Sequence, residues 1–304
     1  TFGSVVDEID PKNFENVLIP IFPKTLQKEI INTIKEINCL RDEATKLFKK
    51  ADDLFYEKLD LKRLQDINEN SAKSEPLSFI LPQTKMITHV GHTRLDASYH
   101  VPITQDIILE LNNLKMSIIN IGDERISKNL ILPGRFKRNY VEKAHGVPFL
   151  GGKQIRQFDL SDVKYLSKKF HNARISKELI LKENMILITS SGTIGNVVLA
   201  PKYFENWTAS QHIVRIIPAQ DVNPGYLYAY LVSEYGHELI TRYTFGSVVD
   251  EIYDSHISDI PIPLPSKQVM NIIGNPVLEA NQKINTAYNL EQRIICKVEL
   301  QIKK

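Results

Sequence analysis

Apolar or small residues recur at alternating spacings of three and four near the start of the chain. After Ile30, these positions are Thr33, Ile37, Leu40, Ala44, Leu47, Ala51, Leu54, Lys58 and Leu61. A stripe this narrow, sustained for about four heptads, is typical of a coiled-coil seam. The pattern therefore predicts a long helix over residues 25–61.

The same spacing returns near the end of the chain. Its seam positions are Ile273, Val277, Ala280, Ile284, Ala287, Ile294 and Val298, and Glu291 is the one charged residue among them. We expect Pro276 to kink or delay this helix. Neither seam can be buried alone, so we expect the two helices to pair. Two amphipathic helices that pack separately on a globular core remain the alternative.

Between these stretches the seam pattern disappears. Residues 62–76 are polar and predict a linker, and two short strands are expected over 77–81 and 85–90, followed by a loop over 94–100 that Pro102 closes. From residue 101 to 243, short strands alternate with one or two helices, which indicates a single α/β domain. Asn223 is a good N-cap with Pro224 in the first helical position, and this predicts a helix that continues towards Tyr243.

One sequence occurs twice in the chain. The nine residues 1–9 recur identically as residues 244–252, and each copy is followed by Ile-Pro-Ile, at residues 19–21 and 260–262. Identity of this length indicates a structural repeat. Each unit is expected to consist of a Gly-Ser turn, a short extended strand and a helix that starts once the prolines end.

Composition limits the class of protein. With 304 residues, 42% hydrophobic and 24% charged, the chain is long enough for one sizeable core with an extended element, or for two domains. It has no apolar run of membrane-spanning length and no signal peptide, and we expect a cytoplasmic protein. Its two cysteines, Cys39 and Cys296, are too few for a zinc site and are expected to be reduced and mostly packed.

The net charge of +2 conceals a strong asymmetry. Residues 125–177 hold thirteen Lys or Arg against three acids, so this basic window carries +10 and the remainder −8. Aromatic residues are interleaved at Phe136, Tyr140, Phe149, Phe158, Tyr165 and Phe170. A compact basic segment of this kind favours binding to a phosphate backbone, whereas a solvated surface is the alternative.

Two loops are candidates for approaching DNA. Gly151 and Gly152 allow close backbone approach beside Gln154 and Arg156, and a Ser/Thr/Gly-rich turn lies at 189–196. The predicted DNA contacts are Lys137, Arg138, Lys153, Gln154, Arg156, Ser191, Thr193, Asn196 and Gln211. Gln154, Arg156 and Gln211 are the expected base readers, while the lysines and the other arginine hold phosphates.

No catalytic constellation is found in the sequence. The turn at 189–196 is not a Walker A loop, because no Lys-Ser/Thr pair follows its last glycine. His212 is interpreted as a strand-end histidine. No clustered His/Cys set predicts a metal, and no residue is nominated as catalytic.

In its order of motifs, the chain resembles the specificity subunit of a type I restriction-modification system. The matching segments are Arg94 to Tyr99, Ser191 to Gly195, Asn223 to Leu227, Gly246-Ser247 and Ile260 to Pro265 with Gln268. The resemblance implies an α/β target-recognition domain flanked by two long helices that form an antiparallel coiled coil. It also implies a non-catalytic protein that binds double-stranded DNA, reads one half of a bipartite target and docks adenine methyltransferase subunits. The methyltransferase subunits would carry S-adenosylmethionine and recruit a restriction-translocation subunit. The chain itself would need no cofactor.

The chain departs from this family in carrying one recognition domain instead of two. The expected division is 1–24, the tail motif of a preceding domain; 25–75, the central helix and linker; 76–243, the recognition domain; and 244–304, the repeat motif and terminal helix. A shortened chain, a half-subunit that pairs with a second copy of itself and the specificity portion of a single-chain enzyme all fit this division. A compact nuclease or methyltransferase fragment and a coiled-coil scaffold that binds protein are the competing classes.

Overall fold

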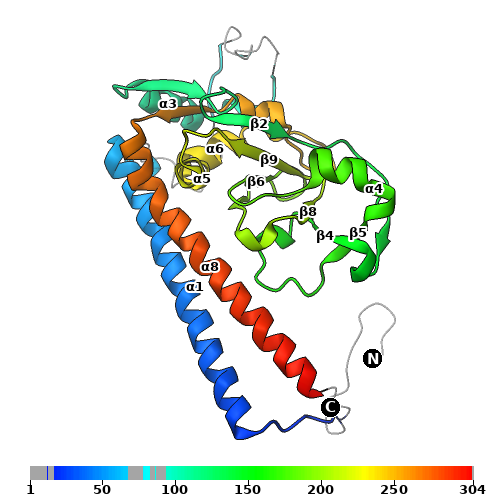
Figure 1. The fold of residues 1–304 in the computed structure, drawn as a ribbon. Coiled ribbons are helices and arrows are strands. Elements are labelled where there is room, and N and C mark those ends of the chain that lie inside the picture. Colours follow the sequence, from blue (N-terminus) through cyan, green and yellow to red (C-terminus); the bar gives the residue numbers. More distant parts are fainter. Residues whose placement is uncertain (1–11, 13–16, 68–77, 83–85, 87–93, 303–304) are drawn as a thin grey trace.

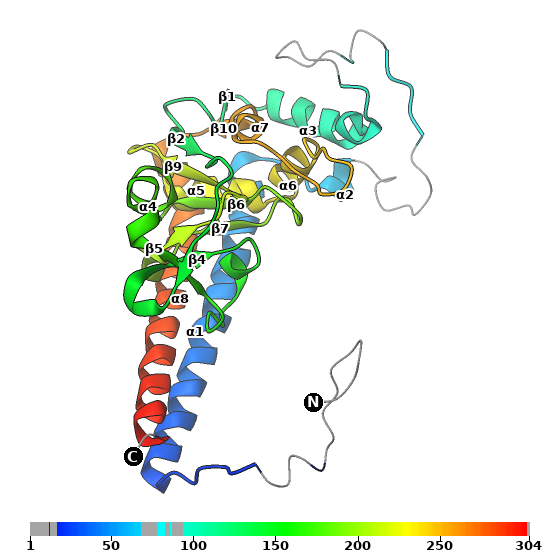
Figure 2. The ribbon, with the colours of Figure 1, turned by 90° about the vertical axis from the view of Figure 1, so that its right-hand side faces the viewer.

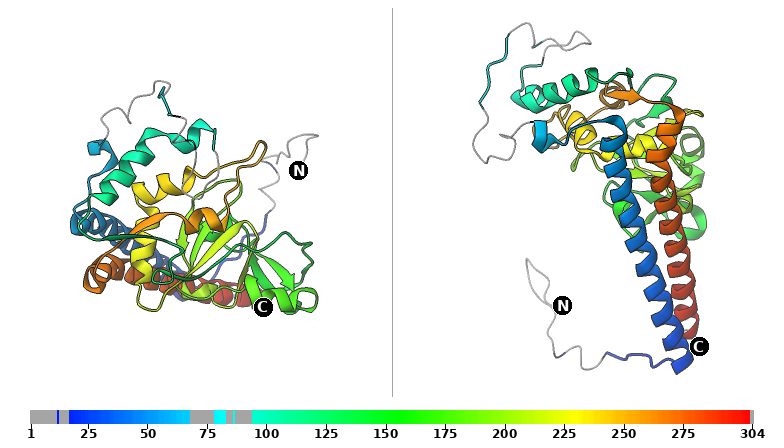
Figure 3. Two further views of the ribbon diagram at one scale, coloured as in Figure 1. Left: turned by 90° about the horizontal axis from the view of Figure 1, so that it is seen from above. Right: turned by 90° about the vertical axis from the view of Figure 1, so that its left-hand side faces the viewer.

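Two long helices form the axis of the molecule. The computed structural model describes residues 12, 17–67, 78–82, 86 and 94–302. Helices α1 (Lys24–Leu59) and α8 (Lys267–Ile302) contain 36 residues each and run antiparallel, side by side (Figure 1). They remain paired when the molecule is viewed from its left-hand side (Figure 3, right). The predicted pairing of the two seams is therefore confirmed, and the helices do not pack separately on a core.

Small residues occupy the seam between α1 and α8. Ala44, Ala51, Ala280 and Ala287 are each at most 1% exposed, which lets the two backbones approach closely. Glu291, the charged seam position, accepts a hydrogen bond of 2.9 Å from Arg41 on α1.

Two further ion pairs cross between the helices, Lys283 with Glu43 at 2.8 Å and Lys297 with Glu29 at 2.5 Å. In these three pairs the residue number on α8 rises while that on α1 falls. The ion pairs therefore fix an antiparallel register.

Two details of the predicted helices are wrong. Pro276 does not delay α8, which begins nine residues earlier and includes the buried proline in its interior. Lys58 is not a seam residue, since it pairs with Glu57 near the surface. At that end of α1, Phe55 and Leu59 are buried instead, because the helix face has turned towards the α/β unit.

The α/β unit is built on two four-stranded sheets at one end of the helical pair (Figure 2). The first sheet is antiparallel, in the order β2 (Ser127–Ile131), β9 (Ile213–Pro218), β6 (Ile186–Thr189) and β7 (Val197–Leu199). The second has the order β3 (Tyr140–Val141), β5 (Lys164–Ser167), β4 (Gly146–Leu150) and β8 (Thr208–Ala209), with β4 and β8 parallel.

The first sheet separates two hydrophobic cores. Ile186 and Ile188 face the main core, which includes the ends of α1 and α8, whereas Leu187 faces a smaller core that also contains Leu150 and Phe204. This alternation follows from the period of two along a strand.

Short helices and turns complete the unit. They are α2 (Leu64–Ile67), α3 (Pro102–Asn112), α4 (Lys168–Arg174), α5 (Pro224–Val232), α6 (Glu234–Thr241) and α7 (Asp254–Ser258), with 3₁₀ turns at Ala97–His100, Lys143–His145, Gln154–Arg156 and Lys202–Phe204 and a π turn at Ile175–Leu179. Pro102 opens α3 and does not close a loop. No strand occurs over 78–81. The strand expected over 85–90 lies outside the described residues except for Met86, which is in a bend.

The capping of α5 is confirmed, but its predicted length is wrong. The Asn223 side chain accepts a hydrogen bond of 2.9 Å from the Gly225 amide. The helix does not continue to Tyr243, because Ser233 interrupts it and caps a new helix, α6, by accepting from the Gly236 amide at 3.2 Å. A serine side chain that accepts a hydrogen bond from a backbone amide offers the backbone an alternative to the helical hydrogen bond, and this favours a helix boundary.

The second repeat copy forms a hairpin followed by a strand. Phe245 and Glu251 form an isolated bridge, and β10 (Pro261–Leu264) pairs antiparallel with β1 (Ser117–Asn120). Residues 1–9 of the first copy lie outside the described residues. Its Ile-Pro-Ile segment is irregular, with Ile21 92% exposed, so the expected strand is present only in the second copy.

Both cysteines are exposed, which corrects the expectation that they are packed. Cys39 and Cys296 point away from the seam, and a hydrogen bond to Glu43 raises the pKa of the Cys39 thiol. Among the described residues, no helix is both long and apolar enough to cross a bilayer.

Candidate nucleic-acid interface

The basic window folds largely into a lobe made of β3, β4, β5 and α4 (Figure 1). Within the described residues, ion pairs occupy only three of its thirteen cations: Arg125, Arg135 and Arg174. The cations without such a pair are Lys128, Lys137, Arg138, Lys143, Lys153, Arg156, Lys164, Lys168, Lys169 and Lys177. Cations left unpaired by carboxylates remain available to phosphates.

Several aromatic residues of this lobe support cations. The Arg138 guanidinium lies 5.5 Å from the ring centre of Phe149, and the Lys164 ammonium lies 5.2 Å from that of Tyr140. These cation–π contacts hold the side chains over the lobe surface. Phe149 itself is buried, so its primary role is packing.

Three segments that are distant in sequence meet at one edge of the two sheets. The Ser210 amide donates to the Leu150 carbonyl at 2.9 Å, which joins the end of β4 to the turn before β9. The Ser190 amide donates to the His212 carbonyl at 2.9 Å and joins the same turn to the hairpin between β6 and β7. Both loops selected from the sequence are therefore brought together around residues 209–213.

A pocket of about 310 Å³ opens beside Gln211. Its walls come from residues 132–135, Ser190 and Ser191, Gln211 and His212, and residues 251–254, where the second repeat ends. We call it the Gln211 pocket. At its wall, Arg135 pairs with Glu251 at 3.0 Å, although the arginine side chain remains 80% exposed.

The amide of Gln211 is only half satisfied. Its Nε2 lies 3.1 Å from Nε2 of His212, whereas Oε1 is buried and has no hydrogen-bond partner in the described part of the chain. Burial, helped by Arg138, lowers the pKa of His212, so this imidazole is neutral at neutral pH. His212 lies immediately before β9, as its interpretation as a strand-end histidine requires.

A buried arginine lies beneath this turn. Arg215 of β9 is 0% exposed, and it donates to the carbonyls of Ala209, Ser210 (3.3 Å) and Ile213 (2.9 Å). Burial lowers its pKa to about 10, so the guanidinium still carries its charge at neutral pH. The three carbonyls flank Gln211 and His212, and Arg215 therefore fixes the path of this turn.

Gln154 differs from Gln211 because both ends of its amide are engaged. Its Oε1 accepts from the Gly151 amide at 2.9 Å, and its Nε2 donates to Asp162 at 3.4 Å. These bonds close the glycine loop on itself. Lys153, next to it, is exposed and has no ion pair among the described residues.

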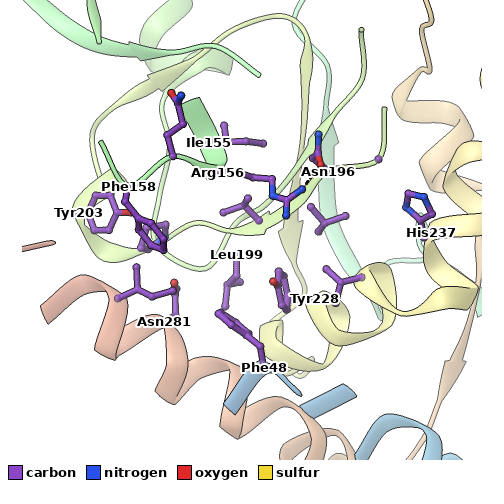
Figure 4. A pocket seen from close by; sticks show the side chains of 17 residues that line it. Phe48, Ile155, Arg156, Phe158, Asn196, Leu199, Tyr203, Tyr228, His237 and Asn281 are labelled. Atoms are coloured by element: carbon purple, nitrogen blue, oxygen red, sulfur yellow. Dashed lines mark hydrogen bonds between the residues drawn. The ribbon is translucent and has the colours of Figure 1, made fainter. Parts of the chain in front are cut away.

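Arg156 and Asn196 lie on a different side of the hairpin. Arg156 donates to Asn196 at 2.5 Å, and both line a cavity of about 530 Å³ between the α/β unit and the helical pair (Figure 4). Figure 4 shows Phe48 of α1 and Tyr228 of α5 on the opposite wall. The nine predicted contacts therefore do not form one cluster: Ser191 and Gln211 face the Gln211 pocket, whereas Arg156 and Asn196 face the helices.

The remaining candidates lie on exposed surface. Lys137 and Thr193 are exposed, and Arg138 is half-buried over Phe149. The Thr193 carbonyl accepts a hydrogen bond of 2.5 Å from the Thr189 hydroxyl, so Thr193 helps to hold the turn through its backbone.

Sequence reasoning missed four residues of this region: Arg135, His212 as a pocket wall, Arg215 and Glu251. Glu251 belongs to the repeated nine residues, so the repeat itself was a signal that this segment contacts the recognition loops. A lone arginine inside an apolar strand, Ile-Val-Arg215-Ile-Ile, was a second signal, because a charge at that position requires buried hydrogen-bond acceptors.

A family model described as the type I restriction modification DNA specificity domain matches residues 133–286. A search of curated protein sequences finds no match.

Solved structures that are similar include the S subunit of a type I restriction-modification system from M. genitalium (15% identity, TM-score 0.39) and the HsdS subunit from Thermoanaerobacter tengcongensis (14%, 0.40). A third concerns complex assembly and conformational transition of the type I R-M system (14%, 0.37). The alignments cover 98%, 98% and 99% of this chain but 66%, 64% and 60% of those chains, so this chain spans less than two thirds of their length.

Proposed function

Because this chain belongs to the family of type I restriction-modification DNA specificity domains, we propose that it reads one half of a bipartite DNA target and docks the methyltransferase that modifies it. In this proposal the chain selects the sequence and does no chemistry itself. S-adenosylmethionine would be bound by the methyltransferase partner, not by this chain.

One observation carries the proposal of DNA binding. Ten cations of the basic window have no ion pair among the described residues, and their lobe borders the edge where the three recognition segments meet. Unpaired cations release counterions when they meet phosphates, and loops at a sheet edge can enter a groove. Such an arrangement supplies both affinity and a place for sequence readout.

The predicted contacts receive different roles in this proposal. Lys137, Arg138 and Lys153 hold phosphates, while Ser191, Thr193 and Gln211 approach the bases. Gln154, Arg156 and Asn196 remain predicted contacts, but each must first release a hydrogen bond within the protein.

The helical pair supplies the surface for the methyltransferase. One end of the pair projects away from the α/β unit (Figure 2). At this free end, Ile31 (52%), Ile34 (47%) and Ile295 (43%) are exposed. Apolar side chains on a paired helix surface favour a protein partner. A restriction-translocation subunit would join through the methyltransferase, and a second copy of this chain or another recognition domain would read the second half-site.

The experiment is a selection of DNA. The complex that co-purifies with this chain from its own cell is incubated with a randomised duplex pool at two salt concentrations, and the retained DNA is sequenced. An enriched motif whose retention falls steeply with salt supports the proposal. Retention without a motif limits the chain to non-specific binding, and no retention favours the scaffold class. Turnover of DNA by the isolated chain with magnesium would favour the nuclease class.

A further inference from the structure

The Gln211 pocket contains an acceptor that the protein itself does not satisfy. Gln211 Oε1 has no hydrogen-bond partner within the described residues, although the turn around it is otherwise bonded closely. Its amide makes one side-chain contact, to His212 Nε2 at 3.1 Å. If the side chain rotates into the pocket, it loses one hydrogen bond, to His212. In exchange, the buried oxygen that has no partner can meet a donor.

We propose that this pocket receives the major-groove edge of one DNA base that presents an amino group there, adenine or cytosine, and that Gln211 reads it. This inference rests on the proposed function and assigns one step of it to a specific residue.

The chemistry of the unsatisfied atom selects the ligand. An amide oxygen needs a hydrogen-bond donor, and neither phosphates nor the sugars of DNA supply one within a duplex. In the major groove only the N6 amino group of adenine and the N4 amino group of cytosine donate. The Oε1 atom of Gln211 is thus suited to a base and unsuited to the backbone, whereas the Lys137 ammonium can only donate and is suited to a phosphate.

The walls of the pocket fit a segment of DNA. Arg135 lies at its wall with a side chain 80% exposed, and Arg138, three residues further along the chain, is half-buried over Phe149. These cations would hold the phosphates that flank the base. Glu251, the one acid among the pocket's walls that is paired with a cation, neutralises part of this charge through Arg135 and keeps the opening ordered.

Arg215 serves as the positioning residue. Its guanidinium binds the carbonyls of Ala209, Ser210 and Ile213, on both sides of Gln211, from inside the protein. A base reader has to be held within a fraction of an ångström, and a buried cation with three acceptors achieves this without contacting DNA.

The test compares the motifs that variants of the complex select from the randomised duplex pool. Gln211→Ala should lose the preference for adenine or cytosine at one position by about 5- to 100-fold, with the other positions unchanged. Gln211→Glu keeps an acceptor and should retain the preference at that position, while its charge weakens binding to all sequences. Gln211→Met replaces the alanine variant if the latter does not fold.

Gln157→Ala is the matched control. The Oε1 atom of Gln157 is also buried without a partner in the described residues, but this side chain lines the cavity towards the helices. Its variant should select the parental motif. If Gln157→Ala and Gln211→Ala behave alike, the effect comes from protein stability and the inference is wrong.

Arg215→Met tests the positioning role. It should relax the same base position as Gln211→Ala, and the double variant should add nothing at that position. A relaxation of all positions together would show that Arg215 supports only the fold. If the parental complex selects no motif, the proposed function fails; if it selects a motif that Gln211→Ala leaves unchanged, only this inference fails.

Discussion

At the scale of single residues, a side chain can bind a partner only with hydrogen-bonding groups that the protein itself does not already satisfy. Gln154 and Gln211 are the same residue type at the same edge of the molecule, but the amide of Gln154 is bonded at both ends and that of Gln211 at one. Residue type therefore identifies a candidate, and its hydrogen-bond partners decide its role.

Lys137 should contribute affinity without specificity. It is exposed on the basic lobe, so Lys137→Ala should weaken binding to all duplexes by about 1 kcal/mol and reduce the slope of log affinity against log salt by about one. Lys49→Ala, at an exposed position of α1, is the control and should change neither quantity. A change of preference at one base position in Lys137→Ala would contradict the assignment to phosphate.

Asp96 should stabilise the protein in a pH-dependent way. Arg94 binds its carboxylate through two bonds of 2.7 Å, holds its pKa at about 2, and also donates to the Thr244 carbonyl at 3.3 Å. Because the pKa is lower in the folded state, this stabilisation is present above about pH 4 and is lost as the pH falls towards 2. The group is partly exposed, so the contribution should stay below about 1 kcal/mol.

The measurement for Asp96 is the melting temperature of the parent and of Asp96→Asn across this pH range. The two should differ at pH 7 and converge near pH 2. Asp123→Asn is the control. Asp123 pairs with Arg125 at the same spacing, but within the described residues this arginine makes no hydrogen bond to a distant segment, so the pair should stabilise the protein less. A difference that persists unchanged at pH 2 would argue against the ion pair as the cause.

At the scale of elements, the helical pair depends on small residues. Alanines at the seam bring α1 and α8 close enough for ion pairs to cross on both sides, and these pairs fix the register. The pairing of the two helices thus depends on the small size of the seam side chains as well as on their hydrophobicity.

Ala44→Leu should overpack this seam. Ala44 is 1% exposed, and extra methylene groups at such a position typically cost about 1–3 kcal/mol of the free energy of unfolding. Thr45→Leu is the control, because the next residue along α1 is exposed and its substitution should cost less than about 0.5 kcal/mol. Equal losses in denaturant unfolding would show that the pair has room to adjust.

At the scale of the whole molecule, the second repeat copy links the recognition loops to the terminal helix. The Gly192 amide donates to the Asp250 carbonyl and the Ile252 amide to the Ser190 carbonyl, both at 3.0 Å. The repeat therefore clamps the hairpin at 189–196 before the chain enters β10 and α8.

Gly246→Ala should loosen this clamp. Gly246 has a φ of 129°, and a Cβ there would lie 2.1 Å from the Val249 carbonyl oxygen, so the variant is strained by about 1–3 kcal/mol. Amide exchange in residues 190–196 should accelerate. Gly134→Ala, where a Cβ meets nothing within 4 Å, is the control. Unchanged exchange in Gly246→Ala would mean that the hairpin is held by other contacts.

The sequence by itself determined the long helices, their pairing, the capping of α5 and the location of the basic window, because these depend on local periodicity, spacing and charge. It did not determine that Ser233 divides the predicted helix, nor that Lys58 leaves the seam, since both depend on packing against the α/β unit. The tertiary structure alone decided which predicted contacts share a face. Arg156 and Asn196 face the helical pair and Gln211 faces the pocket, because hydrogen bonds between distant strands, and a buried Arg215, orient the loops that carry them.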